Sequence, residues 1–218
     1  MSAVLTLVRH GQASFGTEDY DRLSPLGHEQ AGWLGGYLAA HDLSFDRAYR
    51  GTLRRHRETA EGMARAATLP EPQEDARLNE LNFEALAGEY LAATGSTAIT
   101  SRAGFLHHFP EIFAQWADGK ISNDGESYEA FRTRVRQALD AAIADGGQTL
   151  FVTSGGVIGT AIAQVLGLPP RGAADLMVNI HNASVHQLVA EEGRVRLSLF
   201  NASPHLDPQE RRHARTYI

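Results

Sequence analysis

The chain has 218 residues, of which 43% are hydrophobic, a size and composition that suit one α/β domain with a sizeable core. Its formal net charge is −6 and its isoelectric point lies near 5.9, which argues against a general surface for nucleic acids or anionic membranes. Cysteine is absent, so disulfides, thiolate metal sites and a cysteine nucleophile are excluded. Because the net charge is negative, any bound anion must be held by a local cluster of basic groups.

The N-terminal residues lead directly into an apolar segment, without the basic region and apolar stretch of a signal peptide. No apolar run approaches the roughly 20 residues that a membrane-spanning helix needs. These features predict a soluble, cytoplasmic protein with no membrane or nucleic-acid partner. The sequence does not indicate an oligomeric state.

The first predicted element is a buried strand over Val4–Val8, which runs without a break into Arg9-His10-Gly11. The glycine is expected to let the backbone turn sharply, and strand ends of this kind are where open α/β sheets bind ligands. An arginine offers a planar fork for phosphate, and an imidazole can act as nucleophile, base or donor. On its own, the Arg-His pair equally fits a strand capped by salt-bridged surface residues.

A helix is predicted from Ser24-Pro25, an N-cap followed by a first-turn proline, to about Ala40. Gly27 is expected to allow close approach to a neighbouring element. A short strand over Phe45–Tyr49 should follow, and a second helix should start at Gly51-Thr52.

The second helix carries an unusual concentration of basic residues, Arg54-Arg55-His56-Arg57, within one turn. These groups would repel one another unless an anion lay nearby. A solvated basic face is the simpler interpretation for Arg54 and Arg57.

The segment 85–122 is rich in Ala, Gly, Thr and aromatic residues and contains two interrupted amphipathic stretches, Tyr90–Thr94 and Phe105–Ala117. We interpret it as a helical insertion over the mouth of a pocket in a single domain spanning residues 1–218. A helix capped by Glu126 or Ser127 should follow from Tyr128 to about Ala144.

Near the C-terminus, a buried strand over Thr149–Thr153 leads into Ser154-Gly155-Gly156 and an apolar helix, Val157–Leu166. Free amides at such a helix start favour an anion. Two strands, Ser184–Val189 and Arg194–Leu199, should form a hairpin or a strand pair, and the tail from Ser203 should be loosely held.

Several of these segments together resemble the histidine phosphatase superfamily, the phosphoglycerate mutase-like proteins, from the first strand to the region 178–188. The resemblance is carried by a strand followed by Arg-His-Gly and by four later segments, Leu23–Ala31, Leu53–Ala60, Arg77–Glu80 and Gly125–Ser127. It implies a three-layer α/β/α sandwich with a mostly parallel sheet and a small helical insertion.

The resemblance also implies metal-independent phosphomonoester hydrolysis through a phosphohistidine at His10. Arg9 and Arg55 would hold the phosphoryl oxygens, and Glu80, at the end of a strand, would protonate the leaving group, with Glu84 as its rival. No metal and no cofactor are expected. The partner should be a small phosphorylated substrate, with a phosphoprotein as an alternative.

One departure from the family pattern stands out. The second pocket histidine of the family precedes Gly-Gly, and here that position is Ser154. Ser154 and Gly155 could still bind phosphate, but the missing imidazole predicts a slow enzyme that Ser154→His would accelerate. His181, in the loop before the last strands, is a possible replacement.

Two other functions remain open from the sequence. A cofactor-dependent phosphoglycerate mutase would hand the same phosphoryl group to another hydroxyl, but the mutases of the family carry a basic, tryptophan-rich region after the Glu80 element. Here that region has no arginine until Arg102. A degenerate phosphate-binding or regulatory protein is the other alternative, and Ser154 is the feature that supports it.

Overall fold

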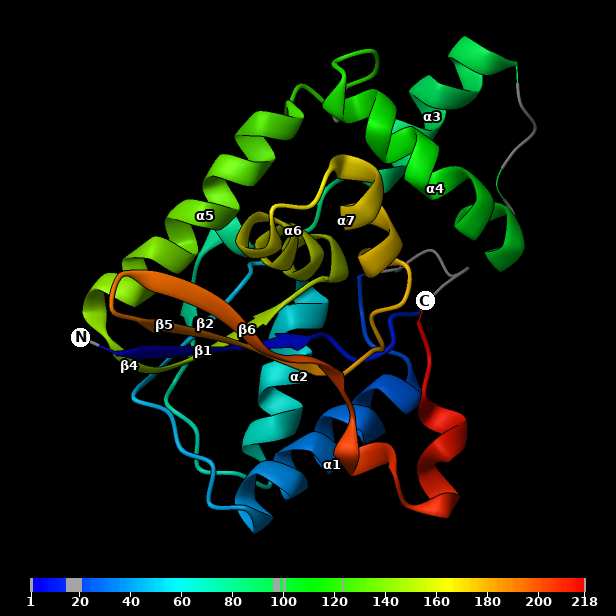
Figure 1. Cartoon of the computed structure of the whole chain (residues 1–218). Coiled ribbons are helices and arrows are strands. Elements are labelled where there is room, and N and C mark those ends of the chain that lie inside the picture. Colours follow the sequence, from blue (N-terminus) through cyan, green and yellow to red (C-terminus); the bar gives the residue numbers. More distant parts are fainter. Residues whose placement is uncertain (1, 15–20, 96–98, 100, 123, 218) are drawn as a thin grey trace.

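The structure, a computed structural model, describes residues 2–14, 21–95, 99, 101–122 and 124–217. A six-stranded sheet in the order β3-β2-β4-β1-β5-β6 lies between helices (Figure 1). Its parallel part consists of β1 (Ala3–Arg9), β2 (Arg47–Arg50), β3 (Gln73–Glu74) and β4 (Gly147–Thr153). β5 (Val185–Glu191) and β6 (Arg194–Ala202) form an antiparallel hairpin at one edge. This mixed, mostly parallel sheet flanked by helices confirms the predicted fold class, and the hairpin is the one expected before the tail.

Helices cover both faces of the sheet (Figure 1). On one face lie α1 (Pro25–Ala40) and α2 (Arg54–Ala64), and on the other lie α5 (Tyr128–Asp145) and α6 (Gly155–Leu166). Beyond α6 are α3 (Phe83–Thr94), α4 (Arg102–Ala117) and α7 (Pro170–Met177). Short 3₁₀ helices span Ala76–Leu78, Pro204–Leu206 and Gln209–Ala214.

The two faces of the sheet have separate hydrophobic cores, because successive side chains of a strand point to opposite sides. In β1, Leu5 and Leu7 pack into the core under α5 and α6, whereas Val8 packs with Leu34 and Met63 of α1 and α2. This alternation fixes the register of β1, so that its last residues emerge at a defined edge of the sheet.

The start of α1 follows the sequence prediction closely. The Ser24 hydroxyl accepts a hydrogen bond from the Gly27 amide, Pro25 occupies the first turn, and the helix ends at Ala40. Gly27 and Gly11 contact each other directly, since a Cβ on Gly11 would lie 2.4 Å from the Gly27 carbonyl oxygen. Gly11 has no positive φ, so the reason for glycine is this contact and not the sharp turn that we predicted.

Several predicted boundaries were wrong. β2 begins at Arg47 rather than Phe45, and α2 begins at Arg54 rather than at Gly51-Thr52. The Gly51 amide still bonds to the Val152 carbonyl of the sheet, and the Thr52 amide donates to Asn79 Oδ1, so neither residue can enter the helix. The residues before Glu80 form a 3₁₀ turn capped by Asp75, not a strand.

The C-terminal tail is not loosely held, contrary to the prediction. Gln30, in α1, donates hydrogen bonds from Nε2 to the Ala214 carbonyl and to Thr216 Oγ1. The Asn182 amide donates to the Thr216 carbonyl at 2.8 Å. These buried polar contacts fix the tail along α1 and carry Tyr217 back toward the carboxyl ends of the strands. Helix α7, which begins with Pro170, was also missed.

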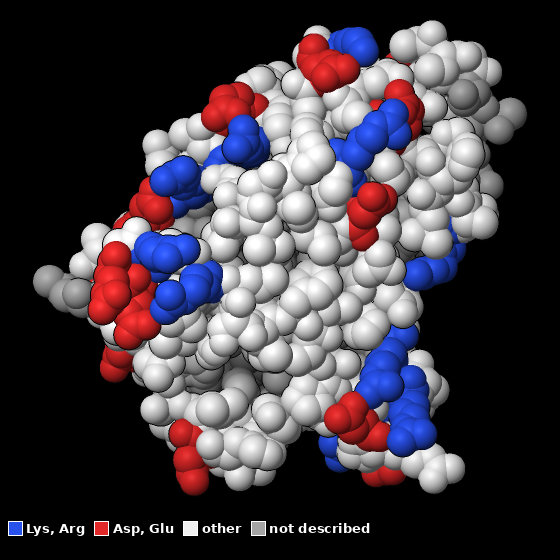
Figure 2. Space-filling view, in the orientation of Figure 1, with Lys and Arg blue, Asp and Glu red and all other residues white. Residues whose placement is uncertain are grey.

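Charged side chains of both signs are interspersed on the face shown in Figure 2, and the middle of that face is largely uncharged. None of the helices in the described parts of the chain is both long and apolar enough to span a bilayer.

Acidification below neutral pH should destabilise the fold through its buried histidines. Burial, reinforced by nearby arginines, lowers the pKa of His186 from 6.5 to about 3 and that of His205 to about 4. These side chains stay neutral in the folded protein and take up a proton near pH 6.5 only when it unfolds. Their stabilisation is therefore complete above pH 6.5 and is lost as the pH falls toward the folded values, by about 1.4 kcal/mol per unit of pKa difference.

Urea unfolding at pH 7.5, 6 and 5 measures this loss, and His205→Gln should make the free energy of unfolding less dependent on pH. A free energy of unfolding that stays constant from pH 7.5 to 5 would contradict the expectation.

Candidate active site

The site lies at the carboxyl ends of β1 and β4, which pair in parallel with Arg9 opposite Thr153. His10 follows β1, Ser154 follows β4, and the His10 amide donates to the Thr153 carbonyl at 2.9 Å. The first turn of α2 brings Arg55 to the same edge. The fold thus gathers residues that are 9, 55 and 154 positions along the chain around one point.

His10 is 4% exposed, and its Nδ1 lies 2.7 Å from the Gly11 carbonyl oxygen. A carbonyl can only accept a hydrogen bond, so Nδ1 carries the proton and Nε2 of the neutral ring keeps its lone pair. Burial, followed by the charges of Arg55 and Arg9, holds the pKa of His10 well below 6.5. At neutral pH the ring is therefore an unprotonated nucleophile with a fixed tautomer.

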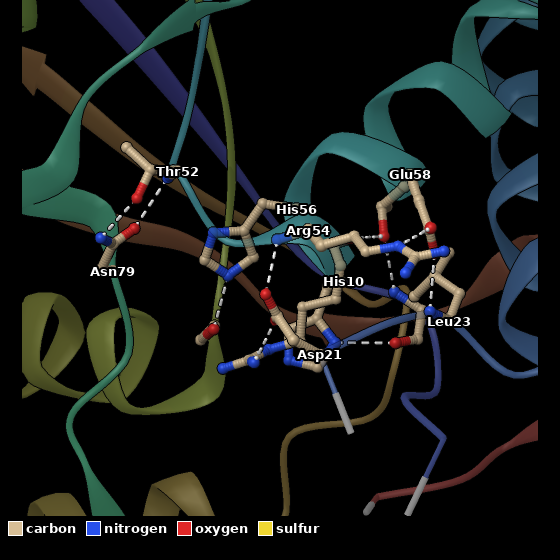
Figure 3. Close-up of polar contacts among 12 residues, drawn as sticks. His10, Asp21, Leu23, Thr52, Arg54, His56, Glu58 and Asn79 are labelled. Carbon is tan, nitrogen blue, oxygen red and sulfur yellow. Dashed lines mark hydrogen bonds and ion pairs between the residues drawn. The ribbon is translucent and has the colours of Figure 1, made fainter. Parts of the chain in front are cut away.

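Arg55 is nearly buried and binds an internal anion. Its Nη1 donates to Asp21 Oδ1 at 2.6 Å, and the Arg54 amide donates to the other Asp21 oxygen at 2.8 Å (Figure 3). The Arg55 guanidinium, expected to hold phosphate, and the amide at the start of α2 here share one carboxylate. A two-oxygen anion thus fits this end of the helix.

The neighbouring arginines behave as predicted for a solvated face. Arg54 and Arg57 are about half exposed and pair with Glu58 and Glu61 one turn later in α2, at 2.6 Å and 3.6 Å.

Arg9, the last residue of β1, lines the cavity. Its Nη1 donates to the Ile180 carbonyl, and a Cβ on Gly155 would lie 3.5 Å from its Nε. The guanidinium therefore rests against the backbone at the start of α6.

Glu80 faces the same pocket. Its Oε2 accepts from the Gly156 amide and its Oε1 accepts from the Leu81 amide, each at 3.1 Å. A Cβ on Gly156 would lie 2.1 Å from Glu80 Oε1, so this position of the carboxylate requires glycine. Glu84 is exposed on α3 and does not line the pocket. Geometry thus favours Glu80 over its rival.

His56 is the site residue that sequence reasoning missed. It is fully buried, its Nε2 lies 2.7 Å from Ser154 Oγ, and its ring centroid is 5.7 Å from that of His10 (Figure 3). Burial, with the charges of Arg55 and Arg50, lowers the pKa of His56 well below 6.5. The only signal in the sequence was its place directly after Arg55.

His181, the possible replacement for the missing imidazole, contacts the C-terminal tail. Its ring packs edge-on against Tyr217 at 4.7 Å, it is partly buried, and it does not line the cavity. Burial and the charges of Arg215, Arg9 and Arg102 lower its pKa.

A cavity of about 400 Å³ lies beside Arg9 and Glu80, while the buried His10 and Arg55 are not among its lining residues. Arg9, Glu80 and Gly155 line its polar end, and the remainder is mostly apolar, with Phe105 and Phe109 of α4 among its walls. Arg102 lies 4.1 Å above the Tyr217 ring in the wall. Two helices of the predicted insertion, α3 and α4, contribute to this wall, while residues 96–98 and 100 lie outside the described residues. Among the described residues, no three His, Asp or Glu side chains are grouped as a metal site would require.

The chain is similar to known proteins in family and in fold. The family model of the histidine phosphatase superfamily (branch 1) matches residues 5–203. A mycobacterial glucosyl-3-phosphoglycerate phosphatase structure is 25% identical, with a TM-score of 0.67 over 92% of this chain and 99% of its own. A phosphoglycerate mutase from Bacillus anthracis is 24% identical, with a TM-score of 0.68 over 94% and 95% of the two chains.

A phosphoserine phosphatase from Entamoeba histolytica, in complex with phosphoserine, has the same fold at 20% identity, with a TM-score of 0.65 over 94% and 99% of the two chains. A search of curated proteins found no match. Because the family model spans nearly the whole domain, the chain belongs to branch 1 of the histidine phosphatase superfamily.

Proposed function

We propose that this protein hydrolyses phosphomonoesters through a phosphohistidine at His10. The observation that carries the proposal is the neutral, buried imidazole of His10, with its Nε2 lone pair available beside Arg9 and Arg55. Other buried histidines of the protein are also neutral, but His10 combines this state with its place at the end of β1, directly after Arg9, which lines the cavity.

The reaction has two balanced steps. His10 Nε2 attacks phosphorus, the bond from phosphorus to the ester oxygen breaks, and the Glu80 carboxyl group gives its proton to the departing oxygen. Water then attacks the phosphohistidine, losing a proton to Glu80, and inorganic phosphate leaves with His10 restored. Arg9 and Arg55 neutralise the charge on the phosphoryl oxygens. The ion pair between Arg55 and Asp21 must break so that Arg55 can bind the substrate.

The cavity suggests the substrate class. Phe105 and Phe109 line the same cavity as Glu80, the proposed donor to the leaving group. An ester with an apolar or aromatic body would bury that body against these rings, whereas a small polar ester would leave them in contact with water. We therefore favour small organic phosphates with an apolar part over phosphoglycerate.

The test is to incubate the protein with an aryl phosphate and with ³²P-labelled donor, and to trap the labelled enzyme in alkali. Hydrolysis together with an acid-labile, alkali-stable label on His10 is expected. Phosphoglycerate isomerisation primed with bisphosphoglycerate, faster than hydrolysis, would indicate the mutase instead. Phosphate binding with no label and no hydrolysis would indicate the degenerate binding protein.

Addition of a chelator should leave the rate of hydrolysis unchanged, because the proposed chemistry assigns the charge of the phosphoryl group to Arg9 and Arg55 and not to a metal. Rates measured with and without excess EDTA check this. Loss of activity in the chelator, restored by a divalent cation, would contradict the mechanism.

A further inference from the structure

We propose that His56 replaces the second pocket imidazole of the superfamily by acting through the hydroxyl of Ser154. In this arrangement Ser154 donates a hydrogen bond to the transferring phosphoryl group, and His56 is the positioning residue that holds the hydroxyl for that task. The inference rests on the proposed function and assigns a role to two residues that the family pattern leaves unmatched.

The first observation is the unusual use of Ser154. It occupies the N-cap of α6 with extended backbone angles, φ −117° and ψ 166°, where a serine hydroxyl normally accepts a hydrogen bond from an amide of the first turn. No such capping bond forms here. The hydroxyl instead lies 2.7 Å from His56 Nε2, in a fully buried position. Its orientation is therefore set by the imidazole and not by the helix.

The second observation concerns the proton on His56. Its Nδ1 has no hydrogen-bond partner among the described residues and is packed against Gly51, where a Cβ would lie 2.2 Å from this atom. A buried N–H without an acceptor is rare, so the neutral ring keeps its proton on Nε2. Nε2 then donates to Ser154 Oγ, and the serine hydrogen remains available for a further acceptor.

The third observation is where that hydrogen can go. The rings of His56 and His10 are 5.7 Å apart (Figure 3), and the charge of Arg55 acts on both. His10 and Ser154 directly follow the paired strand ends Arg9 and Thr153, so a phosphoryl group on His10 would place an oxygen next to Ser154. A charge-assisted hydrogen bond from Ser154 to this oxygen would strengthen as negative charge develops.

The same geometry changes the expectation for Ser154→His. Ser154 is fully buried, and the His56 ring already fills the space in front of it. A histidine at 154 therefore has no room unless the ring at 56 is removed. The sequence predicted that Ser154→His alone raises turnover, whereas the structure predicts that only the combination with His56→Ala restores a working imidazole.

The test is the affinity for vanadate, a mimic of the transferring phosphoryl group, measured in a double-mutant cycle. Ser154→Ala and His56→Leu should each weaken vanadate binding by about 10- to 100-fold, and the double variant should lose no more than either one. His56→Gln, which keeps a donor, should recover part of the loss, and His56→Ala with Ser154→His should recover most of it. His205→Leu, which removes a buried histidine that does not line the cavity, controls for general loss of packing.

Full vanadate affinity in Ser154→Ala, or losses that add in the double variant, would overturn the inference, as would a loss confined to His181→Ala. If His56→Leu does not fold, the vanadate affinity of Ser154→Ala still tests the inference. With an aryl phosphate, kcat should fall by about 10²–10³ and KM by less than about threefold in either direction. If the parent protein forms no phosphohistidine, the proposed function fails, while the vanadate cycle still decides the roles of His56 and Ser154.

Discussion

Replacement of His10 with alanine is expected to lower phosphomonoester hydrolysis by at least about 10⁴-fold, because the only proposed nucleophile is removed. Phosphate and vanadate binding should survive in part, because Arg9 and Arg55 both remain. Catalysis and phosphate binding can be separated because they depend on different residues. His10 supplies the bond to phosphorus, whereas the guanidinium groups come from independent elements, the end of β1 and the first turn of α2.

Steady-state rates with an aryl phosphate, together with the ³²P label on the protein, measure the effect. His28→Ala is the matched control, since His28 is largely exposed on α1 and touches only Glu58 among ion-pair partners in the described chain. This control should keep both label and rate. Residual turnover of His10→Ala within tenfold of the parent, or a label that persists in it, would remove His10 as the nucleophile.

The sequence predicted those parts of the fold that depend on local signals. Ser24 and Pro25 fixed the start of α1 because capping chemistry acts within four residues, and the apolar run before Arg9 fixed β1 because burial of a whole strand leaves a continuous pattern. The prediction for the tail from Ser203 failed for the opposite reason. Its order depends on contacts of Gln30 with residues more than 180 positions away, and these leave no local trace.

The candidate site also contains residues that the sequence predicted and one that it did not. The family resemblance assigned Arg9, His10 and Arg55 to one site, and the parallel pairing of β4 with both β1 and β2 brings the elements that carry them to one edge of the sheet. His56 was overlooked because its importance depends on Ser154, which is 98 positions away in sequence and 2.7 Å away in space. A departure from a family pattern at one position can thus be matched by a change on another element, which only the structure reveals.

Replacement of Glu80 with glutamine should slow hydrolysis selectively according to the leaving group. Alkyl phosphates, whose departing oxygen needs a proton, should lose about 10²–10⁴ in kcat/KM, whereas activated aryl phosphates should lose less than about tenfold. The expected selectivity follows from position, since Glu80 lines the cavity beside Arg9 while its oxygens are oriented by the amides of Leu81 and Gly156.

A series of phosphate esters with leaving groups of graded acidity measures this dependence as the slope of log kcat/KM against the leaving-group pKa. The slope should steepen in Glu80→Gln and stay unchanged in Glu84→Gln, the exposed neighbour on α3. Thermal unfolding of each variant is needed, because glutamine presents an NH₂ group to one of the two amides that Glu80 accepts from. Equal losses on alkyl and aryl esters, with a folded variant, would show that the departing oxygen takes its proton from Glu84 or from solvent and not from Glu80.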